Sequence, residues 1–430
     1  MNIAKKSFEL AAQTVWLIDR VKDHAVKIGS GVTPSGGATS YLEEGIPLLR
    51  SQNVHFEGLR LDDVAYISED THDEMSGTKL KERDVLLNIT GASIGRCTFV
   101  PVGFGEGNVN QHVCIIRPSA MLDHRYLVYC LTAPWGQDQI LSSYTGASRQ
   151  GLGQRDLGEI QIPLPTVDEQ RRIIAYLDVS CAVINAAVSA KRRQLEVLED
   201  IRNVALHSAF ARLAQEPHER IKDLAIKIGS GVTPEGGAAG YLNRGIPLLR
   251  SQNVHFDGLR LDDVAYISAE THAEMCNSQI RPKDVLLNIT GASIGRCTFV
   301  PDGFGEGNVN QHVCIIRTGP KLDHRFLTAF LASPLGQDQI LSTFTGASRQ
   351  GLSHKELGLI RIPFPNVQKQ HETVKLIERE EMKHRQLRDL IKHQIEALID
   401  YRKSLIHECV TGQRRITEAD IAHVRHSKEV

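Results

Sequence analysis

Two long stretches of the chain place apolar residues at intervals of three and four. The first stretch carries this seam at Ile174, Leu177, Cys181, Ile184, Val188, Leu195 and Leu198, and the second at Leu387, Ile391, Gln394, Leu398, Tyr401 and Leu405. Such spacing is typical of a coiled coil and predicts two helices. Thr166, followed three residues later by Glu169, is a helix-start signal, and Pro217 and Gly412 stand near the expected ends. A helix of about 45 residues is roughly 65–70 Å long. Because each seam is narrow, we expect the two helices to pair; two separate surface helices are the alternative.

Elsewhere the apolar residues occur in short runs. "DVLLNIT" from 84, "CTFVP" from 97 and "HVCIIR" from 112 are rich in β-branched residues and predict strands. The segment 123–144, "DHRYLVYCLTAPWGQDQILSSY", predicts a pair of short helices, and glycine-rich turns such as "TGASIG" and "GFGEGN" separate these elements. The runs predict a mixed α/β (α+β) globular domain.

The chain contains this plan twice. Positions 21–160 and 221–360 match at 101 of 140 residues without insertion or deletion, whereas 166–210 and 366–410 match at only 8 of 45. A near-identical globular unit is thus followed each time by a divergent helical segment of the same length. We expect a short N-terminal helix (1–15), globular units at 16–165 and 216–365, helices at 166–215 and 366–412, and a tail at 413–430.

The composition gives little direct information about function. The net charge is −1 and the pI about 7.0, which does not favour an autonomous DNA-binding domain. We find no signal peptide and no continuous apolar run of about eighteen residues, so we expect a cytoplasmic protein that does not contact a membrane. The sequence carries no phosphate-binding loop and no nucleophile elbow, and His72 and His272 have no second histidine at helical spacing. We therefore expect no catalytic residue, no metal and no cofactor in this chain.

Polar residues instead gather in four turn clusters that recur unchanged 200 positions later: "RSQNVHF", "TGASIGR", "NVNQH" and "TGASRQG". Asn and Gln side chains match the adenine edge, Arg matches guanine, and Ser and Thr reach phosphates and bases. The same residue types also form turns for local reasons, so each residue has a purely structural alternative. The candidate DNA-contacting residues are Thr33, Arg50, Ser51, Gln52, Asn53, Thr90, Ser93, Arg96, Asn110, Gln111, His112, Thr145, Ser148, Arg149 and Gln150 in the first copy, and Thr233, Arg250, Ser251, Gln252, Asn253, Thr290, Ser293, Arg296, Asn310, Gln311, His312, Thr345, Ser348, Arg349 and Gln350 in the second.

These motifs, with "IPLPTVDEQRRII" leading from a globular unit into a long helix, resemble the specificity subunit of type I restriction-modification systems. The resemblance covers about 16–413; in the second copy "QRR" is replaced by "QHE". It implies two target-recognition domains separated by two long antiparallel helices, with pseudo-two-fold symmetry. It also implies double-stranded DNA, two methyltransferase subunits and motor-nuclease subunits as partners, with S-adenosylmethionine, ATP and Mg²⁺ bound by those partners.

We therefore expect a non-catalytic recognition subunit in which each repeat reads half of a bipartite site. Because the four clusters are identical in both copies, we expect an interrupted palindrome. Two alternatives stay open: the recognition subunit of a system whose methyltransferase and nuclease are fused, and a symmetric scaffold that does not bind DNA.

Overall fold

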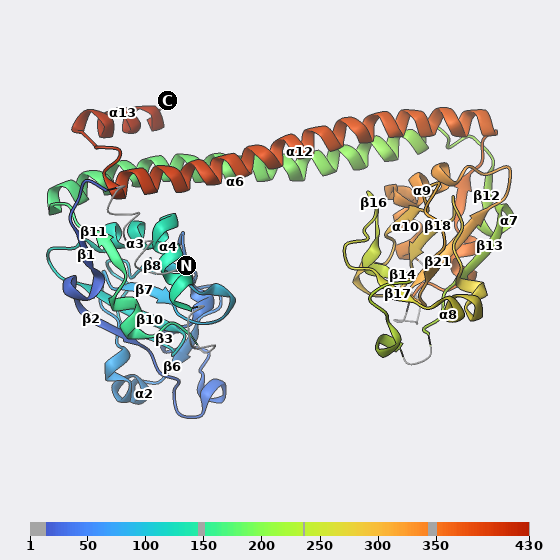
Figure 1. Cartoon of the computed structure of the whole chain (residues 1–430). Helices are drawn as coiled ribbons and strands as arrows, with labels where there is room; N and C mark the ends of the chain where they lie inside the picture. The colour runs from blue at the N-terminus through green and yellow to red at the C-terminus, as the bar shows by residue number, and fades with distance from the viewer. Residues whose placement is uncertain (1–13, 145–150, 235–236, 343–350, 430) are drawn as a thin grey trace. The chain divides into compact units, whose positions relative to one another are not determined.

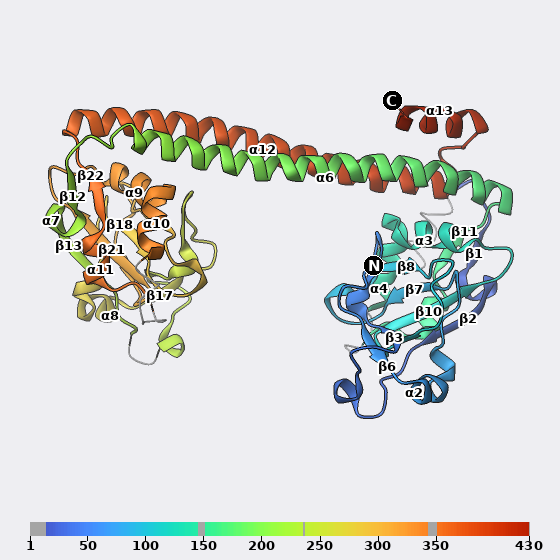
Figure 2. The ribbon, with the colours of Figure 1, turned by 180° about the vertical axis from the view of Figure 1, so that it is seen from behind.

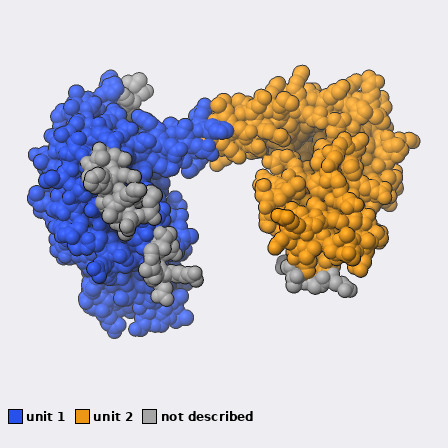
Figure 3. All heavy atoms as spheres, viewed as in Figure 1, with its two compact units in different colours: residues 1–192, 393–430 blue, residues 193–392 orange. Residues whose placement is uncertain are grey.

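The computed structural model describes residues 14–144, 151–234, 237–342 and 351–429, so nearly all of the N-terminal helix expected at 1–15 lies outside the described residues. The chain forms two compact units (Figure 3): unit 1 comprises residues 1–192 and 393–430, and unit 2 comprises residues 193–392. Each unit contains one globular domain and a part of each long helix.

Unit 1 has short strands and short helices. The strands are β1 (Ile18–Arg20), β2 (Ala25–Ser30), β3 (Ile46–Leu49), β4 (Val54–His55), β5 (Gly58–Leu59), β6 (Ala65–Ile67), β7 (Val85–Asn88), β8 (Cys97–Phe99), β9 (Asn108–Val109), β10 (Val113–Pro118) and β11 (Gln161–Pro163). The short helices are α2 (Glu69–Glu74), α3 (His124–Thr132), α4 (Pro134–Tyr144) and α5 (Gln154–Gly158). The three predicted strands are β7, β8 and β10, and the predicted helix pair is α3 and α4, so these predictions are confirmed.

While β1 pairs with β11 and β4 with β5 in two-stranded sheets, the other seven strands form two sheets that share a core. One is antiparallel with the order β2-β10-β7-β8, and the other has the order β6-β3-β9, in which β3 and β9 are parallel. Strand β7 is buried on both faces: Val85 and Leu87 belong to the core that α3 covers, whereas Leu86 belongs to the core on the other face. This explains why its sequence is continuously apolar and does not alternate.

Unit 2 repeats this topology. Its strands are β12 (His218–Arg220), β13 (Ala225–Ser230), β14 (Ile246–Leu249), β15 (Val254–His255), β16 (Gly258–Leu259), β17 (Ala265–Ile267), β18 (Val285–Asn288), β19 (Cys297–Phe299), β20 (Asn308–Val309), β21 (Val313–Thr318) and β22 (Arg361–Pro363). Its short helices are α7 (Ile221–Leu224), α8 (Ala269–Glu274), α9 (His324–Ala332), α10 (Pro334–Ser342) and α11 (His354–Leu359). Its sheets have the orders β13-β21-β18-β19, β17-β14-β20, β12-β22 and β15-β16.

The two long helices are α6 (Val167–Ala211) and α12 (Val367–Thr411). The predicted start of α6 is confirmed: the Glu169 backbone N–H donates to Thr166 Oγ1 (3.3 Å), and the Thr166 N–H donates to Glu169 Oε2 (3.4 Å). At the end of α12, Gly412 has a φ of +77°, the left-handed conformation that terminates many helices.

Within each unit the helices pair in an antiparallel manner. In unit 1 the beginning of α6 lies against the end of α12, where Arg402 Nη1 donates to Asn185 Oδ1 (2.6 Å). In unit 2 the end of α6 lies against the beginning of α12, where Arg202 forms an ion pair with Glu381 (2.8 Å). The predicted pairing is confirmed.

The seam predicted for α12 is partly wrong. In α6 the predicted seam residues are buried, apart from the half-buried Leu195, whereas in α12 Leu387 is 49% exposed and Tyr401 is 55% exposed. The contact is made in part by other positions, because Ile395 and Ile399 pack against the core of unit 1. Because an α-helix has 3.6 residues per turn, positions seven residues apart rotate gradually around the helix. Leu387 and Tyr401 therefore do not lie on the face that contacts α6.

Helix α6 is long and apolar enough to cross a membrane, since it contains an 18-residue window with a mean hydropathy of 1.8. The sequence expectation missed this window because occasional charged residues interrupt the apolar run. Ile174, Leu177 and Ile184 of this helix are buried in the core of unit 1, and 39% of the window is buried. Core packing accounts for these apolar residues, as in the core helices of soluble proteins.

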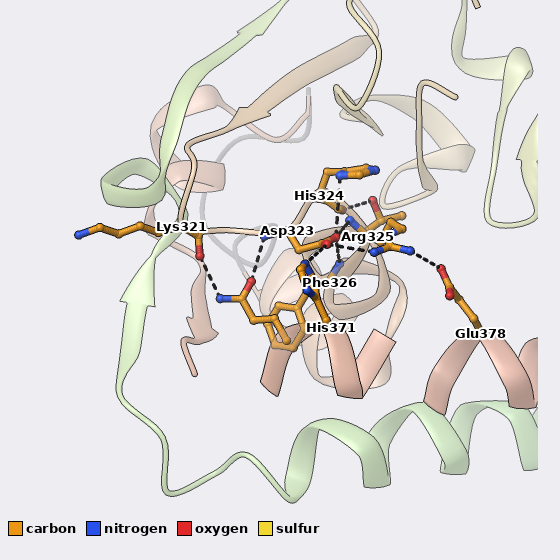
Figure 4. Close-up of polar contacts among 9 residues, drawn as sticks. Lys321, Asp323, His324, Arg325, Phe326, His371 and Glu378 are labelled. Carbon is orange, nitrogen blue, oxygen red and sulfur yellow. Dashed lines mark hydrogen bonds and ion pairs between the residues drawn. The ribbon is translucent and has the colours of Figure 1, made fainter. Parts of the chain in front are cut away.

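A buried glutamine joins each globular domain to its helix. In unit 2, Gln370 is completely buried; its Oε1 accepts from the Asp323 N–H (2.9 Å), and its Nε2 donates to the carbonyls of Lys321 (3.0 Å) and Pro365 (2.9 Å). Figure 4 shows this joint, where His371 also contacts Asp323 (3.0 Å). Gln170 makes the same three bonds in unit 1 at 2.8–3.0 Å.

The tail adds an element to unit 1 alone. Helix α13 (Glu418–Glu429) lies beside the beginning of α6 in both views (Figures 1 and 2). Ile416 and Ile421 are buried in the core of unit 1, and the Arg414 guanidinium lies 5.0 Å from the centroid of the Tyr176 ring. The tail therefore covers the outer face of the helix pair in this unit.

Candidate DNA-reading surface

The sheet topology brings three of the four polar clusters together. Because β3 and β9 are parallel and Leu49 is opposite Val109, the clusters that follow them, at 50–53 and 110–112, emerge at the same edge. Strands β7 and β10 are antiparallel with Asn88 opposite Val113, so the cluster at 90–96 begins where the cluster at 110–112 ends. Segments far apart in the sequence thus form one continuous surface.

Side-chain hydrogen bonds tie these loops together. Asn88 Nδ2 donates to the Ser51 carbonyl (2.8 Å) and to Ser93 Oγ (3.2 Å), which links the first two clusters. Thr90 Oγ1 and His112 Nδ1 are 2.6 Å apart, which links the second and third clusters. Asn88 is completely buried, so it links the loops from beneath the surface.

The third cluster also contacts the glycine-rich segment after β2. Gln111 Nε2 lies 3.0 Å from His112 Nε2, and Thr33 Oγ1 donates to Gln111 Oε1. The predicted residue Thr33 is exposed at this position. The residues Thr33, Gln111 and His112 therefore form one row of polar groups on the surface.

Some of the predicted residues support the loops instead of lining the surface. Asn53 is 1% exposed; its Oδ1 accepts from the Arg50 N–H (2.9 Å), and its Nδ2 donates to the Arg60 carbonyl (2.8 Å). Asn110 is 6% exposed and accepts from the His112 N–H (3.1 Å). The Arg50 side chain donates to the Asp63 carbonyl (3.2 Å). These contacts match the local, structural alternative for Asn53 and Asn110.

The second copy has the same geometry. A hollow in unit 2 is lined by Ser251, Gln252, Thr290, Gly291, Ala292, Ser293, Arg296 and His312. Thr290 Oγ1 is again 2.6 Å from His312 Nδ1, and Asn288 Nδ2 is again 2.8 Å from the Ser251 carbonyl. Asn253 and Asn310 are buried as in the first copy, Arg250 again bonds to the Asp263 carbonyl (3.2 Å), and Thr233 and Gln311 occupy the places of Thr33 and Gln111. The hollow therefore collects predicted residues from three clusters.

The fourth cluster lies outside the described residues. This applies to Thr145, Ser148, Arg149 and Gln150 and to Thr345, Ser348, Arg349 and Gln350. The chain is described again at Gly151, with a φ of +142°, where a Cβ atom would lie 2.7 Å from Thr90 Cγ2. The next N–H, of Leu152, donates to the Ile89 carbonyl (2.9 Å). Gly151 and Leu152 therefore lie beside the beginning of the second cluster.

The sequence prediction missed Asn88 and Asn288. Each stands at the end of a continuously apolar run inside the block repeated without change. A polar residue in that position of a buried strand was the available signal, because a buried amide needs hydrogen-bond partners.

Fold and site together define a protein with two near-identical α+β domains, each with a polar surface of amide, hydroxyl and arginine groups, and a pair of long helices. The family model described as "Type I restriction modification DNA specificity domain" matches residues 38–197 and 220–397. The chain belongs to this family, and it is a specificity subunit, the kind of subunit that recognises DNA without a catalytic function of its own.

Curated relatives agree with this assignment. The chain is 25% identical over 297 residues to the type I restriction enzyme EcoBI specificity subunit of Escherichia coli, a match that covers 63% of this chain and 61% of that subunit. It is 19% identical to the EcoKI specificity subunit of Escherichia coli strain K12, covering 84% and 81%. It is 20% identical to the putative MjaX specificity subunit of Methanocaldococcus jannaschii, covering 93% and 94%.

A solved structure of a type I restriction-modification system contains a chain with the same fold. Its TM-score is 0.69 at 16% identity, covering 92% of this chain and 97% of that one. This likeness confirms the predicted fold class of two α+β domains and long helices.

Proposed function

We propose that this chain reads an interrupted palindrome, a half-site and its reverse complement separated by bases that it does not read. One observation carries this proposal: the two reading surfaces have the same residues in the same geometry. The Thr–His contact is 2.6 Å in both copies, and the amide that ties the loops is 2.8 Å from the serine carbonyl in both. Two surfaces with the same residues in the same geometry should recognise the same base sequence.

The direction of reading is part of the same proposal. We propose that the two equal readers bind the half-sites as the subunits of a symmetric dimer bind a palindrome. Each reader then meets the same sequence on opposite strands. Direct contact with DNA by the residues of the four clusters is part of this proposal.

The two copies differ most at 73–83, where "DEMSGTKLKER" becomes "AEMCNSQIRPK". In the part of unit 2 that the structure describes, none of residues 273–283 lines the hollow formed by the polar clusters. The divergent segment instead bonds within its own domain, for example from Asn308 Nδ2 to Ser278 Oγ (2.8 Å). We therefore expect these differences to leave the half-sites equal.

The partners follow from the family. We propose that two methyltransferase subunits dock on the helices and that motor-nuclease subunits complete a cytoplasmic complex. S-adenosylmethionine, ATP and Mg²⁺ would be bound by those subunits. The purified chain alone would neither methylate nor cut DNA.

The test is the methylated motif of a strain that carries this chain and its partner methyltransferase, obtained by modification-sensitive sequencing. We expect two half-sites that are reverse complements. In binding assays, equivalent substitutions in the left and right half-sites should cost the same, about 1–3 kcal/mol per base pair. Half-sites that are not reverse complements would refute the proposal and implicate the segment 73–83 in base contacts.

A further inference from the structure

Unit 2 contains a second polar hollow, next to the reading surface, that the sequence did not suggest. It lies between the turn of the β15–β16 hairpin and the two long helices, and it has a volume of about 220 Å³. Its lining residues are Glu199, Arg202, His255, Phe256, Asp257, Arg260, Arg296, Glu381, His384, Arg385 and Arg388. Four separate parts of the chain, namely α6, the β15–β16 hairpin, the loop that holds Arg296 and α12, thus contribute charged groups to one small space.

The charges in this hollow do not balance. Five arginines face three acidic residues, an excess of two positive charges before any histidine is protonated. Arg202 is paired with Glu381 at 2.8 Å, and Arg260 with Asp257 at 3.6 Å. Two of the three acids are therefore paired with arginines, and the third, Glu199, lies 3.5 Å from His384.

The remaining arginines are Arg296, Arg385 and Arg388. Arg388 Nε lies 3.5 Å from Asp389, outside the hollow. Among the described residues, the side chains of Arg296 and Arg385 have no hydrogen bond or ion pair. Like charges gathered in one hollow repel each other, and an anion that enters it relieves this repulsion.

The position of the hollow indicates which anion this is. Arg296 lines both this hollow and the reading hollow that contains Gln252 and His312. A duplex whose base edges face the reading hollow carries its phosphates along the rim, where Arg296 stands. The hollow on the far side of Arg296 also contains Arg385 and Arg388 of helix α12.

The counterpart in unit 1 is built differently. The positions equivalent to Arg385 and Arg388 are Asn185 and Val188. Asn185 accepts a hydrogen bond from Arg402 (2.6 Å), and Val188 is 8% exposed within the apolar core. The two additional arginines are thus a property of α12 in unit 2, whereas the recognition domains are nearly identical.

We propose that Arg385 and Arg388, together with Arg296, bind the phosphodiester backbone of DNA beside the half-site read by unit 2. The proposal rests on the proposed DNA-recognition function. It gives the helix pair a direct role in DNA affinity, in addition to holding the domains. Because phosphates carry no sequence information, this contact strengthens binding at one end while leaving the palindromic preference intact.

The test uses the full chain in complex with its methyltransferase partner. The variant R385A/R388A is compared with K375A/R379A, which removes two exposed positive charges from the same helix outside the hollow. Affinity for a duplex with the methylated motif and for a scrambled duplex is measured between 50 and 200 mM salt. Thermal unfolding verifies that both variants fold.

We expect R385A/R388A to bind both duplexes more weakly, with an unchanged ratio between them. Each lost phosphate contact reduces the slope of log K against log salt by about 0.9, so two contacts reduce it by about 1.8. The ratio of the wild-type DNA affinity to that of the variant should then fall by about twelve-fold as the salt concentration rises fourfold. R385K/R388K keeps both charges and should restore the slope, while K375A/R379A should keep the wild-type slope.

A wild-type slope in R385A/R388A would overturn the proposal. A loss confined to the motif duplex would also overturn it, because the two arginines would then read bases. If the wild-type complex binds the motif duplex and the scrambled duplex equally well, the proposed recognition function is wrong. This outcome is measured by the ratio of the two affinities, whereas the phosphate contact is measured by the salt slope.

Discussion

The buried glutamine at each domain–helix joint allows a sharp prediction of stability. In the variant Gln370→Leu, the side chain keeps roughly its volume but loses all three hydrogen bonds. The Asp323 N–H and the carbonyls of Lys321 and Pro365 then lose the partners that now lie at 2.9–3.0 Å. Because Gln370 is fully buried, water does not replace these partners without opening the joint.

The magnitude follows from these three bonds. Each contributes about 1 kcal/mol net, and leaving a buried group unsatisfied costs about 1–3 kcal/mol. The better transfer of leucine into an apolar site offsets part of this loss. We expect unit 2 to lose about 3 kcal/mol of unfolding free energy, and unit 1 to lose the same in Gln170→Leu, since the geometry is the same in both joints.

Urea unfolding gives the global value, and hydrogen exchange of the peptide 319–327 gives the local one, because the Asp323 amide loses its acceptor. Gln368→Leu is the matched control: Gln368 is exposed, two residues away, and bonds only to Glu372 among the described residues. It should change stability by less than about 0.5 kcal/mol. If Gln370→Leu behaves like this control and residue 323 stays protected, the reasoning about the joint is wrong.

Three further changes test other parts of the structure. Asp84→Asn breaks a buried pair in which the carboxylate accepts from Arg117 Nε and Nη2, both at 2.7 Å; unit 1 should lose about 3–5 kcal/mol in urea unfolding, and a loss below about 1 kcal/mol would contradict this. Ile421→Asp places a charge where a 5%-exposed isoleucine now packs, so residues 418–429 should detach and exchange their amide hydrogens rapidly, and retained protection would show that the tail is held by other contacts. The double variant Arg149→Ala with Arg349→Ala should lose about 1–3 kcal/mol of base discrimination at each half-site if these arginines contact guanine. If they contact phosphate, the affinity for all sequences should fall and the salt slope should become smaller. Unchanged binding would favour a structural role.

Elements with a strong local signal were predictable. Strands β7 and β10 are continuous apolar runs between turns, and Thr166 with Glu169 marks the start of a helix by a contact that is local in sequence. The grouping of the clusters was not predictable in the same way. It depends on the parallel pairing of β3 with β9, two short strands some sixty residues apart. The repeat identified candidate residues, but only the topology brings them together.

Spacing and residue type leave the direction of a side chain open. Leu387 and Tyr401 were assigned to the seam because spacing alone does not determine which face of a long helix meets its partner. Asn53 was grouped with contact residues because its residue type is equally suited to a base edge and to the backbone of its own loop. In both cases the type of residue was informative, but its direction is set by tertiary packing. The cationic hollow had no sequence signal, since Arg296 and Arg385 belong to different elements.

The two halves of the repeat are subject to different physical requirements. A reading surface depends on individual atoms: Asn88 donates to two loops at once, and neither a shorter nor an apolar side chain makes both bonds. The helices need only an apolar face and sufficient length, which many sequences provide, so 8 matching positions in 45 suffice. One of these eight is Gln170 with Gln370, a position where the helix meets the domain through hydrogen bonds. The two copies are therefore identical where a contact depends on specific atoms. Arg385 and Arg388 lie in the helices, at positions where the two copies differ.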